Sequence, residues 1–144
     1  MTTALRDLLD TELGPTSWRE VAQERIASFA DATDDPQWIH TDPTRAAAGP
    51  FGTTIAHGFL TLSLCVPMLG EVLPPNGGML LNYGVDRVRF PAPVPSGARI
   101  RGRFRVSSVE ETVSGLRVVI AATVECDAAS KPVCVAELVV LAVR

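Results

Sequence analysis

Apolar residues recur with helical spacing through the first half of the chain and alternate with polar residues through much of the second. A short helix is predicted over Thr2 to Asp10, because the Gly14-Pro15 pair that follows is a strong break. Ser17 then opens a capping-box sequence, and apolar residues return every three or four positions. This pattern predicts one continuous helix from Ser17 to about Thr33.

Two more helices of different character are predicted before the strands begin. The first covers Thr41 to Pro50, where Asp42 suits the capping position and Pro43 the first turn. Gly49 is expected in the left-handed position that ends this helix. The second covers His57 to Gly70 and is apolar on every side, as a helix buried all round is.

Four strands are predicted in the second half, over Met79–Phe90, Arg99–Val106, Leu116–Glu125 and Val133–Val143. Helices followed by strands indicate an α+β protein with an antiparallel sheet. The helix from His57 is the segment that can cover the apolar face of this sheet. We therefore interpret residues 1–144 as one domain, an antiparallel sheet wrapped around a central apolar helix. Since one sheet face cannot bury that helix on all sides, a second subunit is expected to cover the rest.

Composition narrows the class of protein further. The chain has 144 residues, of which 47% are hydrophobic and 20% charged, as in a globular domain, and its net charge of -3 gives no reason to expect nucleic acid. Its three cysteines form no C-x-x-C pair, and an odd number fits reduced thiols. Neither a signal peptide nor a run of membrane-spanning length is recognisable. We expect a soluble cytoplasmic protein that does not enter a membrane.

The stretch DDPQWIHTD, Asp34 to Asp42, carries the candidate chemistry. Asp35 and His40 are five residues apart with Pro36 between them, which suits a turn that brings both side chains into one pocket. A histidine beside an acid can take a proton from water near neutral pH. The same residues also have a structural interpretation, because Asp-Pro pairs often start helices and Asp35 would then be a cap.

Gly58 stands at the start of the apolar helix, where the first amide groups lack internal acceptors. Its N–H can stabilise a developing oxyanion, and the absence of a side chain lets a carbonyl approach. Close packing against the sheet explains the glycine equally well. His57 is interpreted as a residue that fills the N-terminal position of the helix.

Other chemistries have weaker support. Metal ligation was considered for Asp35, His40, Asp42 and His57, but no recognisable ligand spacing supports it, and no metal is expected. The chain has no nucleophile elbow, P-loop or dinucleotide fingerprint. The alternation of the second strand places four arginines on one face, which indicates a solvated face or, as an alternative, a phosphate-binding one.

Two stretches resemble a known family. FADATDDPQWIHTDPTRAAAGPFGTTIAHGFLTLSL, Phe29 to Leu64, resembles the hydratase signature of the MaoC-like dehydratases, which include the (R)-specific enoyl-CoA hydratases. LNYGVDRVRFPAPVPSGARIRG, Leu81 to Gly102, is similar to the strand pair that follows in the nodulation-protein-N-like subgroup. Together the two stretches cover about half of the chain.

The resemblance implies a hot-dog fold and a homodimer with sites at the subunit interface. It implies a first strand over Trp18 to Val21, in place of the start of the predicted helix. It also implies that Asp35 and His40 jointly hold a water, while the Gly58 amide binds the thioester carbonyl.

The chain departs from the commoner signature D-x-N-P-x-H in ways that affect the substrate pocket. Gln37 stands where that signature has Asn and can still form a hydrogen bond, whereas Trp38 is expected to change the pocket wall. Asn82 is a candidate for a further polar contact with the substrate. Ser63 is the nearest candidate for a helix serine that supports the aspartate in some relatives.

The implied reaction is the reversible addition of water to trans-2-enoyl thioesters, giving (R)-3-hydroxyacyl thioesters. It needs no cofactor beyond coenzyme A or a carrier-protein thioester as the carrier of the substrate, so an acyl carrier protein is a candidate partner. The alternatives are a hot-dog thioesterase and a non-catalytic acyl-thioester-binding protein. A hot-dog thioesterase usually uses a carboxylate on or facing the central helix. The predicted helix from His57 to Gly70 contains none, and Glu71 stands at its end.

Overall fold

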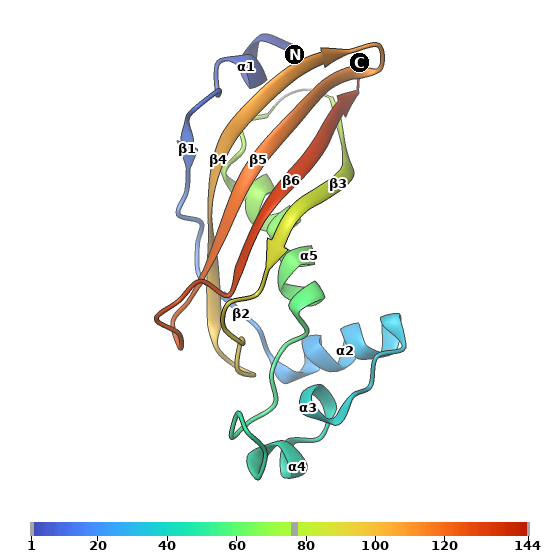
Figure 1. Ribbon diagram of the computed structural model, residues 1–144, viewed down its shortest axis with the longest axis vertical. Helices are drawn as coiled ribbons and strands as arrows, with labels where there is room; N and C mark the ends of the chain where they lie inside the picture. The colour runs from blue at the N-terminus through green and yellow to red at the C-terminus, as the bar shows by residue number, and fades with distance from the viewer. Residues whose placement is uncertain (1, 76–77, 144) are drawn as a thin grey trace.

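The computed structural model consists of long antiparallel strands that curve around one helix, and it describes residues 2–75 and 78–143 (Figure 1). The six-stranded sheet has the order β1-β4-β5-β6-β3, and β2 also pairs with β4. The strands are β1 (Glu12–Leu13), β2 (Arg19–Glu20), β3 (Met79–Arg89), β4 (Arg99–Thr112), β5 (Gly115–Cys126) and β6 (Cys134–Val143). The four long strands match the four predicted ones, with β4 extending six residues beyond Val106 to Thr112.

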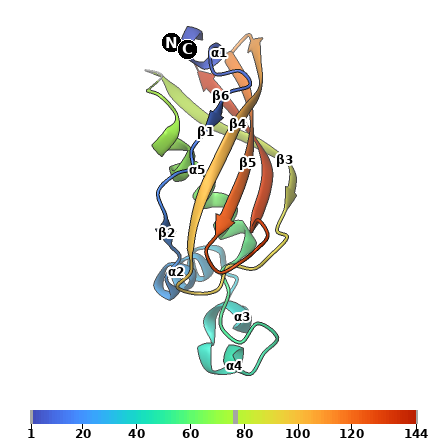
Figure 2. The ribbon, with the colours of Figure 1, turned by 90° about the vertical axis from the view of Figure 1, so that its left-hand side faces the viewer.

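The helices are α1 (Thr2–Arg6), α2 (Gln23–Thr33), α3 (Trp38–Thr41), α4 (Pro43–Ala47) and α5 (Gly58–Val72). Figure 2 shows α5 against the concave side of the sheet, while α2, α3 and α4 gather at one end of it. The α+β class and the central helix are therefore confirmed. Among the described residues, no helix has both the length and the apolar character needed to cross a membrane.

The core lies between α5 and the inward-facing residues of the long strands. Leu60, Leu64, Cys65 and Met68 of α5 are buried there together with alternate residues of β4, such as Ile100 and Phe104. Successive side chains of a strand point to opposite faces, so the arginines between these residues stay on the outer face. The alternation read from the sequence is thus confirmed.

The predicted continuous helix from Ser17 is wrong in its first turns. The helix α2 begins only at Gln23, and the preceding chain runs along the edge of β4 as the short strand β2. The Val21 amide donates to the Ala98 carbonyl and the Val21 carbonyl accepts from Gly97, both at 2.8 Å. These tertiary hydrogen bonds outweigh the local capping signal. The family resemblance predicted a strand in the correct place, although β2 is shorter than Trp18 to Val21.

The end of α4 also differs from the prediction. Asp42 caps the helix as expected, because its Oδ1 accepts a 3.0 Å hydrogen bond from the Arg45 amide. The closing residue, however, is Ala48 with φ -91°, and Gly49 does not have a positive φ. A Cβ at Gly49 would lie 3.1 Å from the Trp38 ring. Glycine is suited to this position because the indole packs against it.

One face of α5 is not covered within the chain, although its sequence is apolar all round. Phe59 is 69% exposed and Val66 46%, and the neighbouring strand β3 exposes apolar residues along its length. We call this surface the open apolar face; its large residues are Phe59 and Val66 of α5, with Leu80 and Val85 of β3, which pair with the inward-facing Ala142 and Leu138 of β6. Exposed apolar residues gathered in this way are typical of an interaction site.

Candidate active site

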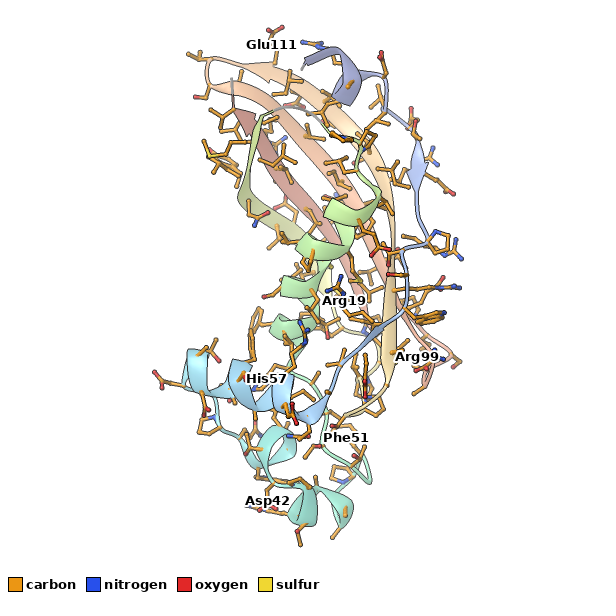
Figure 3. The ribbon with its side chains drawn as sticks, turned by 180° about the vertical axis from the view of Figure 1, so that it is seen from behind. Arg19, Asp42, Phe51, His57, Arg99 and Glu111 are labelled. Carbon is orange, nitrogen blue, oxygen red and sulfur yellow. The ribbon has the colours of Figure 1, made fainter. Side chains whose placement is uncertain are left out.

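Three of the predicted site residues, Asp35, His40 and Gly58, lie near one another around α3 and the beginning of α5. His40 lies on α3 and is buried, and Gly58 is the first residue of α5. Both line a cavity of about 340 Å³, whose other walls include Phe51, Ile55, Thr61, Phe90, Val94 and Val133. Figure 3 shows His57 at the point where α5 starts, beside α2, with Phe51 on the loop below. The fold thus brings His40 and Gly58, 18 residues apart in sequence, to one cavity.

The orientation of the His40 ring leaves one nitrogen free to accept a proton. Nδ1 lies 2.7 Å from the Ile55 carbonyl oxygen, and a carbonyl only accepts, so Nδ1 carries the hydrogen. In the neutral ring Nε2 then keeps its lone pair. Burial lowers the pKa of His40 below its usual 6.5, although the hydrogen bond to Ile55 and the charge of Asp35 act in the opposite direction. The lowered pKa favours the neutral His40 ring near pH 7, with Nε2 able to accept a proton.

A short network of hydrogen bonds fixes α3 in this position. The Gln23 side chain donates to the His40 carbonyl at 2.8 Å and accepts a hydrogen bond from the Thr54 hydroxyl. The Ile55 amide donates to the Ile39 carbonyl at 3.0 Å. Sequence reasoning missed Gln23 and Thr54, because neither spacing nor residue type connects them with a histidine 17 and 14 residues away.

Asp35 does not serve as a helix cap. The residue before α3 is Gln37, whose side chain makes no capping bond, and the Asp35 side chain is 54% exposed on the loop between α2 and α3. The preceding residue, Asp34, has a left-handed φ of 55° that turns the chain at the end of α2. The turn directs Asp35 toward the two histidines, and donor atoms of all three side chains lie within 4.8 Å of one another.

His57 is closer to the pair than its sequence position suggested. Its ring stacks on the His40 ring with centroids 3.7 Å apart and an angle of 23° between the planes. Its Nε2 lies 3.1 Å from the Asp35 carbonyl oxygen and 3.9 Å from the Asp35 carboxylate. It does occupy the N-terminal position of α5, as predicted, but its side chain makes no capping bond there.

These three side chains have donor types that bind metals, yet their geometry does not suit an ion. Imidazole binds a metal through a lone pair in the ring plane, at about 2.0–2.1 Å for zinc. The rings of His40 and His57 are stacked at an angle of only 23°, and the in-plane lone pairs of nearly parallel rings run side by side, which disfavours convergence on one ion. His57 Nε2 also carries a hydrogen toward the Asp35 carbonyl. Asp42, the fourth acid or histidine considered, caps α4 instead.

The Gly58 position is tightly confined by an aromatic ring. A Cβ there would lie 2.7 Å from Cδ2 of Phe90, which follows the end of β3. Within the described part of the chain, no hydrogen bond of the Gly58 amide is present, as expected for the first amide of a helix. The glycine thus combines close packing with an N–H group beside the cavity, so both interpretations of this position fit the structure.

The remaining candidates lie away from this cavity within one chain. Gln37 is exposed, and its carbonyl accepts from the His40 amide at 2.9 Å. Asn82 is on β3 and pairs with Val140 of β6. It stands eight residues before Phe90, a distance of about 25 Å along a strand. The Ser63 hydroxyl donates to the Phe59 carbonyl on the exposed side of α5.

Trp38 does not form the pocket wall that the sequence suggested. Its ring packs against α4, where the Arg45 guanidinium lies 4.3 Å from the ring centroid. Gly49 contacts the same ring from the end of α4. The tryptophan therefore attaches α4 to α3 and stays out of the cavity lining.

The arginine row on β4 is a solvated face whose charges are matched by acids. Arg99 pairs with Asp127 at 2.9 Å, and Arg101 and Arg103 share Glu125 at 2.7 and 2.6 Å. Arg105 lies 3.5 Å from each of two further acids, Asp10 and Glu12. The alternative of a phosphate-binding face has no support in this arrangement.

Comparison with known proteins gives consistent matches over nearly the whole chain. Residues 6–128 match the family model described as "MaoC like domain". The chain is 48% identical to a 3-hydroxyacyl-thioester dehydratase Z of Mycobacterium tuberculosis, over 90% of this chain and 87% of that protein. It is 49% identical to Nodulation protein N of Rhizobium leguminosarum, over 84% and 78%.

Among solved structures, the chain resembles an unliganded R-hydratase of Pseudomonas aeruginosa. The TM-score is 0.76 and the sequences are 26% identical, with 94% of this chain and 82% of that one covered. Such similarity over both chains confirms the hot-dog fold that the sequence predicted.

Proposed function

Because the chain belongs to the MaoC-like domain family of hydratases and dehydratases, we propose that it adds water reversibly to trans-2-enoyl thioesters to give (R)-3-hydroxyacyl thioesters. The observation that carries this proposal is the His40 ring, whose hydrogen is on Nδ1 and whose Nε2 is free. Asp35 lies beside it, and Gly58 lines the same cavity. The (R) configuration is proposed from the similarity to an R-hydratase.

In the hydration direction, Asp35 and His40 hold one water between them. His40 Nε2 accepts a proton from this water while its oxygen forms a bond to the β carbon of the enoyl thioester. The electrons of the double bond move toward the thioester carbonyl, and the proton is then delivered to the α carbon from the same face. Dehydration is the reverse of these steps, so every atom of the water is accounted for without a cofactor.

The Gly58 amide acts on the negative charge that develops at the carbonyl oxygen. A single well-placed donor of this kind contributes about 3 kcal/mol to stabilisation of the transition state. General base catalysis contributes about 10²- to 10⁴-fold in rate. Both contributions come from groups that line one cavity, His40 and Gly58.

The cavity favours an apolar acyl chain. Among the described residues, those that line it include no Asp, Glu, Lys or Arg. An unpaired carboxylate on the acyl chain would lose its hydration there without gaining a partner. We propose a thioester of coenzyme A or of an acyl carrier protein as the substrate, with no metal or other cofactor.

The open apolar face supports a homodimer, and we propose that the chain works as one with sites at the subunit interface. Gly58 and Phe59 are adjacent at the start of α5, so the cavity begins next to this face. We propose the cytoplasm as its location, supported by the free and buried thiols of Cys65, Cys126 and Cys134.

A thioesterase role has less support from the structure. The nearest helix carboxylate, Glu71, is at the far end of α5 and accepts a 2.7 Å hydrogen bond from the Ser17 amide. This contact lowers the pKa of Glu71 and fixes the carboxylate away from the cavity. Release of free coenzyme A without hydration would favour the thioesterase, and tight binding without turnover would favour a non-catalytic role.

The decisive experiment measures hydration of a series of enoyl-CoA substrates, beginning with crotonyl-CoA, and determines the chirality of the product. The proposal predicts consumption of the double bond and an (R)-3-hydroxyacyl product. Asp35→Asn and His40→Gln should each lower the rate by at least about a hundredfold while the circular dichroism spectrum is unchanged. An (S) product, or normal turnover by both variants, would overturn the assignment.

A further inference from the structure

We propose that His57 is a positioning residue that holds Asp35 and His40 in a fixed relation. Its ring joins them by a hydrogen bond to the backbone of Asp35 and by stacking on His40. This inference deepens the proposed function and rests on it.

The hydrogen-bond partners assign opposite tautomers to the two histidines. His57 Nε2 faces the Asp35 carbonyl at 3.1 Å, and since a carbonyl only accepts, this nitrogen carries the hydrogen. His40 carries its hydrogen on Nδ1, toward Ile55. One ring thus presents a free Nε2 for proton transfer, while its stacked neighbour uses the same atom as a donor. The two residues are chemically alike but have different tasks.

His57 supplies the second of two backbone attachments for Asp35. The Asp35 amide donates to the Ala30 carbonyl at 3.0 Å, and the Asp35 carbonyl accepts from His57. The Asp35 carboxylate itself is largely exposed and lies 3.9 Å from His57 Nε2. The position of the carboxylate therefore depends on how firmly the backbone on each side is held. Without His57, the Asp35 backbone would keep, among the described residues, the bond to Ala30, while the next carbonyl, that of Pro36, accepts from the Thr41 hydroxyl at 2.9 Å.

The surroundings of His57 hold its own ring in place. It is 3% exposed and lies between the rings of His40 and Phe29, with the Phe29 centroid 4.9 Å away. Its Nδ1 is buried and, among the described residues, has no hydrogen-bond partner. Such an unpaired buried atom lowers stability. The bond of His57 to Asp35 and its stacking on His40 are a reason for histidine at this position despite that loss.

Two substitutions separate the hydrogen bond from the stacking. His57→Gln keeps an N–H donor at a similar distance along the side chain but loses the ring, whereas His57→Phe keeps a ring and loses the donor. Misplacement of a reacting group by about 1 Å can lower a rate a hundredfold. We expect His57→Phe to reduce kcat by about 10- to 100-fold with little change in KM, and His57→Gln to recover most of this loss.

Ser107→Ala is the control, because Ser107 is exposed on β4, outside the lining of the cavity, and its hydroxyl donates to the Val119 carbonyl. It should keep the wild-type kcat. Equal kcat values for wild type and His57→Phe would overturn the proposal. It would also be overturned if His57→Phe and His57→Gln lost kcat equally and in proportion to their fall in Tm.

A second measurement does not depend on activity. The chain has only two histidines, so a two-dimensional ¹H–¹⁵N spectrum of the imidazoles contains two sets of signals, and either His57 variant leaves one. The wild-type spectrum should show the Nε2–H tautomer for His57 and the Nδ1–H tautomer for His40. The reverse tautomer at His57 would exclude its bond to Asp35. If the wild type shows these tautomers but hydrates no enoyl thioester, the proposed function fails and the geometry stands.

Discussion

Replacement of Gly58 by alanine tests whether this glycine serves the reaction or only the packing. The added Cβ would lie 2.7 to 2.9 Å from three carbons of the Phe90 ring, so the ring must move. Phe90 is 40% exposed and has room to rotate away, which limits the loss of stability to about 1 kcal/mol, at the low end for an overpacked site. For a chain of this size, that loss corresponds to a fall in Tm of roughly 2–4 °C.

The expected loss of activity is much larger than this loss of stability. If the Gly58 amide binds the thioester carbonyl, a methyl group beside it blocks close approach and removes one oxyanion donor. Loss of one donor costs about 2.7–4 kcal/mol in the transition state, or roughly a hundred- to a thousandfold in kcat. The assay is the hydration rate of crotonyl-CoA, measured together with Tm for Gly58→Ala, Phe90→Ala and the double variant.

The double variant distinguishes the two interpretations of Gly58. In Gly58→Ala/Phe90→Ala the new methyl group has space, so Tm should return to that of Phe90→Ala. The rate should nevertheless stay at the low level of Gly58→Ala, because the blocked amide is unchanged. If removal of the Phe90 ring restored activity as well as Tm, the glycine would serve only to accommodate that ring, and its assignment as an oxyanion donor would be refuted.

Three further predictions concern the base, its support and the absence of a metal. Burial lowers the pKa of His40 below 6.5, so activity should fall as the pH drops below that value and His40 becomes protonated. A kcat/KM profile whose acid limb is centred above pH 6.5 would contradict the assignment of His40 as the base. Gln23→Leu removes the hydrogen bond to the His40 carbonyl and should lower the free energy of unfolding by about 1–3 kcal/mol. We expect a fall in Tm of several degrees and a lower kcat. An unchanged Tm would show that Gln23 does not hold α3. Dialysis against EDTA should leave the hydration rate unchanged, whereas a loss that zinc or manganese restores would mean that Asp35, His40 and His57 bind an ion.

The long strands were predicted well because the alternation of apolar and polar residues follows which face of the sheet is buried. In β4, buried Ile100, Phe104 and Val106 alternate with arginines, and no local signal competes with that pattern. Ser17 shows the opposite case. Its capping-box sequence stabilises a helix start through a few local hydrogen bonds. The hydrogen bonds of Val21 to the segment before β4 outweigh that local stabilisation. Local capping signals are therefore weaker guides than periodicity over a long segment.

The candidate site was predictable where residue type and turn signals coincide. Asp35 and His40 are five positions apart with Pro36 between them, and that stretch does turn so that the two side chains come together. Gln23 was not predictable, because its bond to His40 depends on how α2 crosses α3. The prediction for Trp38 was wrong because only the fold shows that α4 folds back and takes the indole.

The two residues at the start of α5 connect both halves of the proposed reaction. His57 contacts Asp35 and His40, and the next residue, Gly58, lines the same cavity as His40. A peptide bond joins them, so a movement of the helix start displaces the support of the base and the oxyanion donor together. This arrangement predicts that variants of His57 and Gly58 will be non-additive in kcat, as neighbouring residues acting on one transition state are.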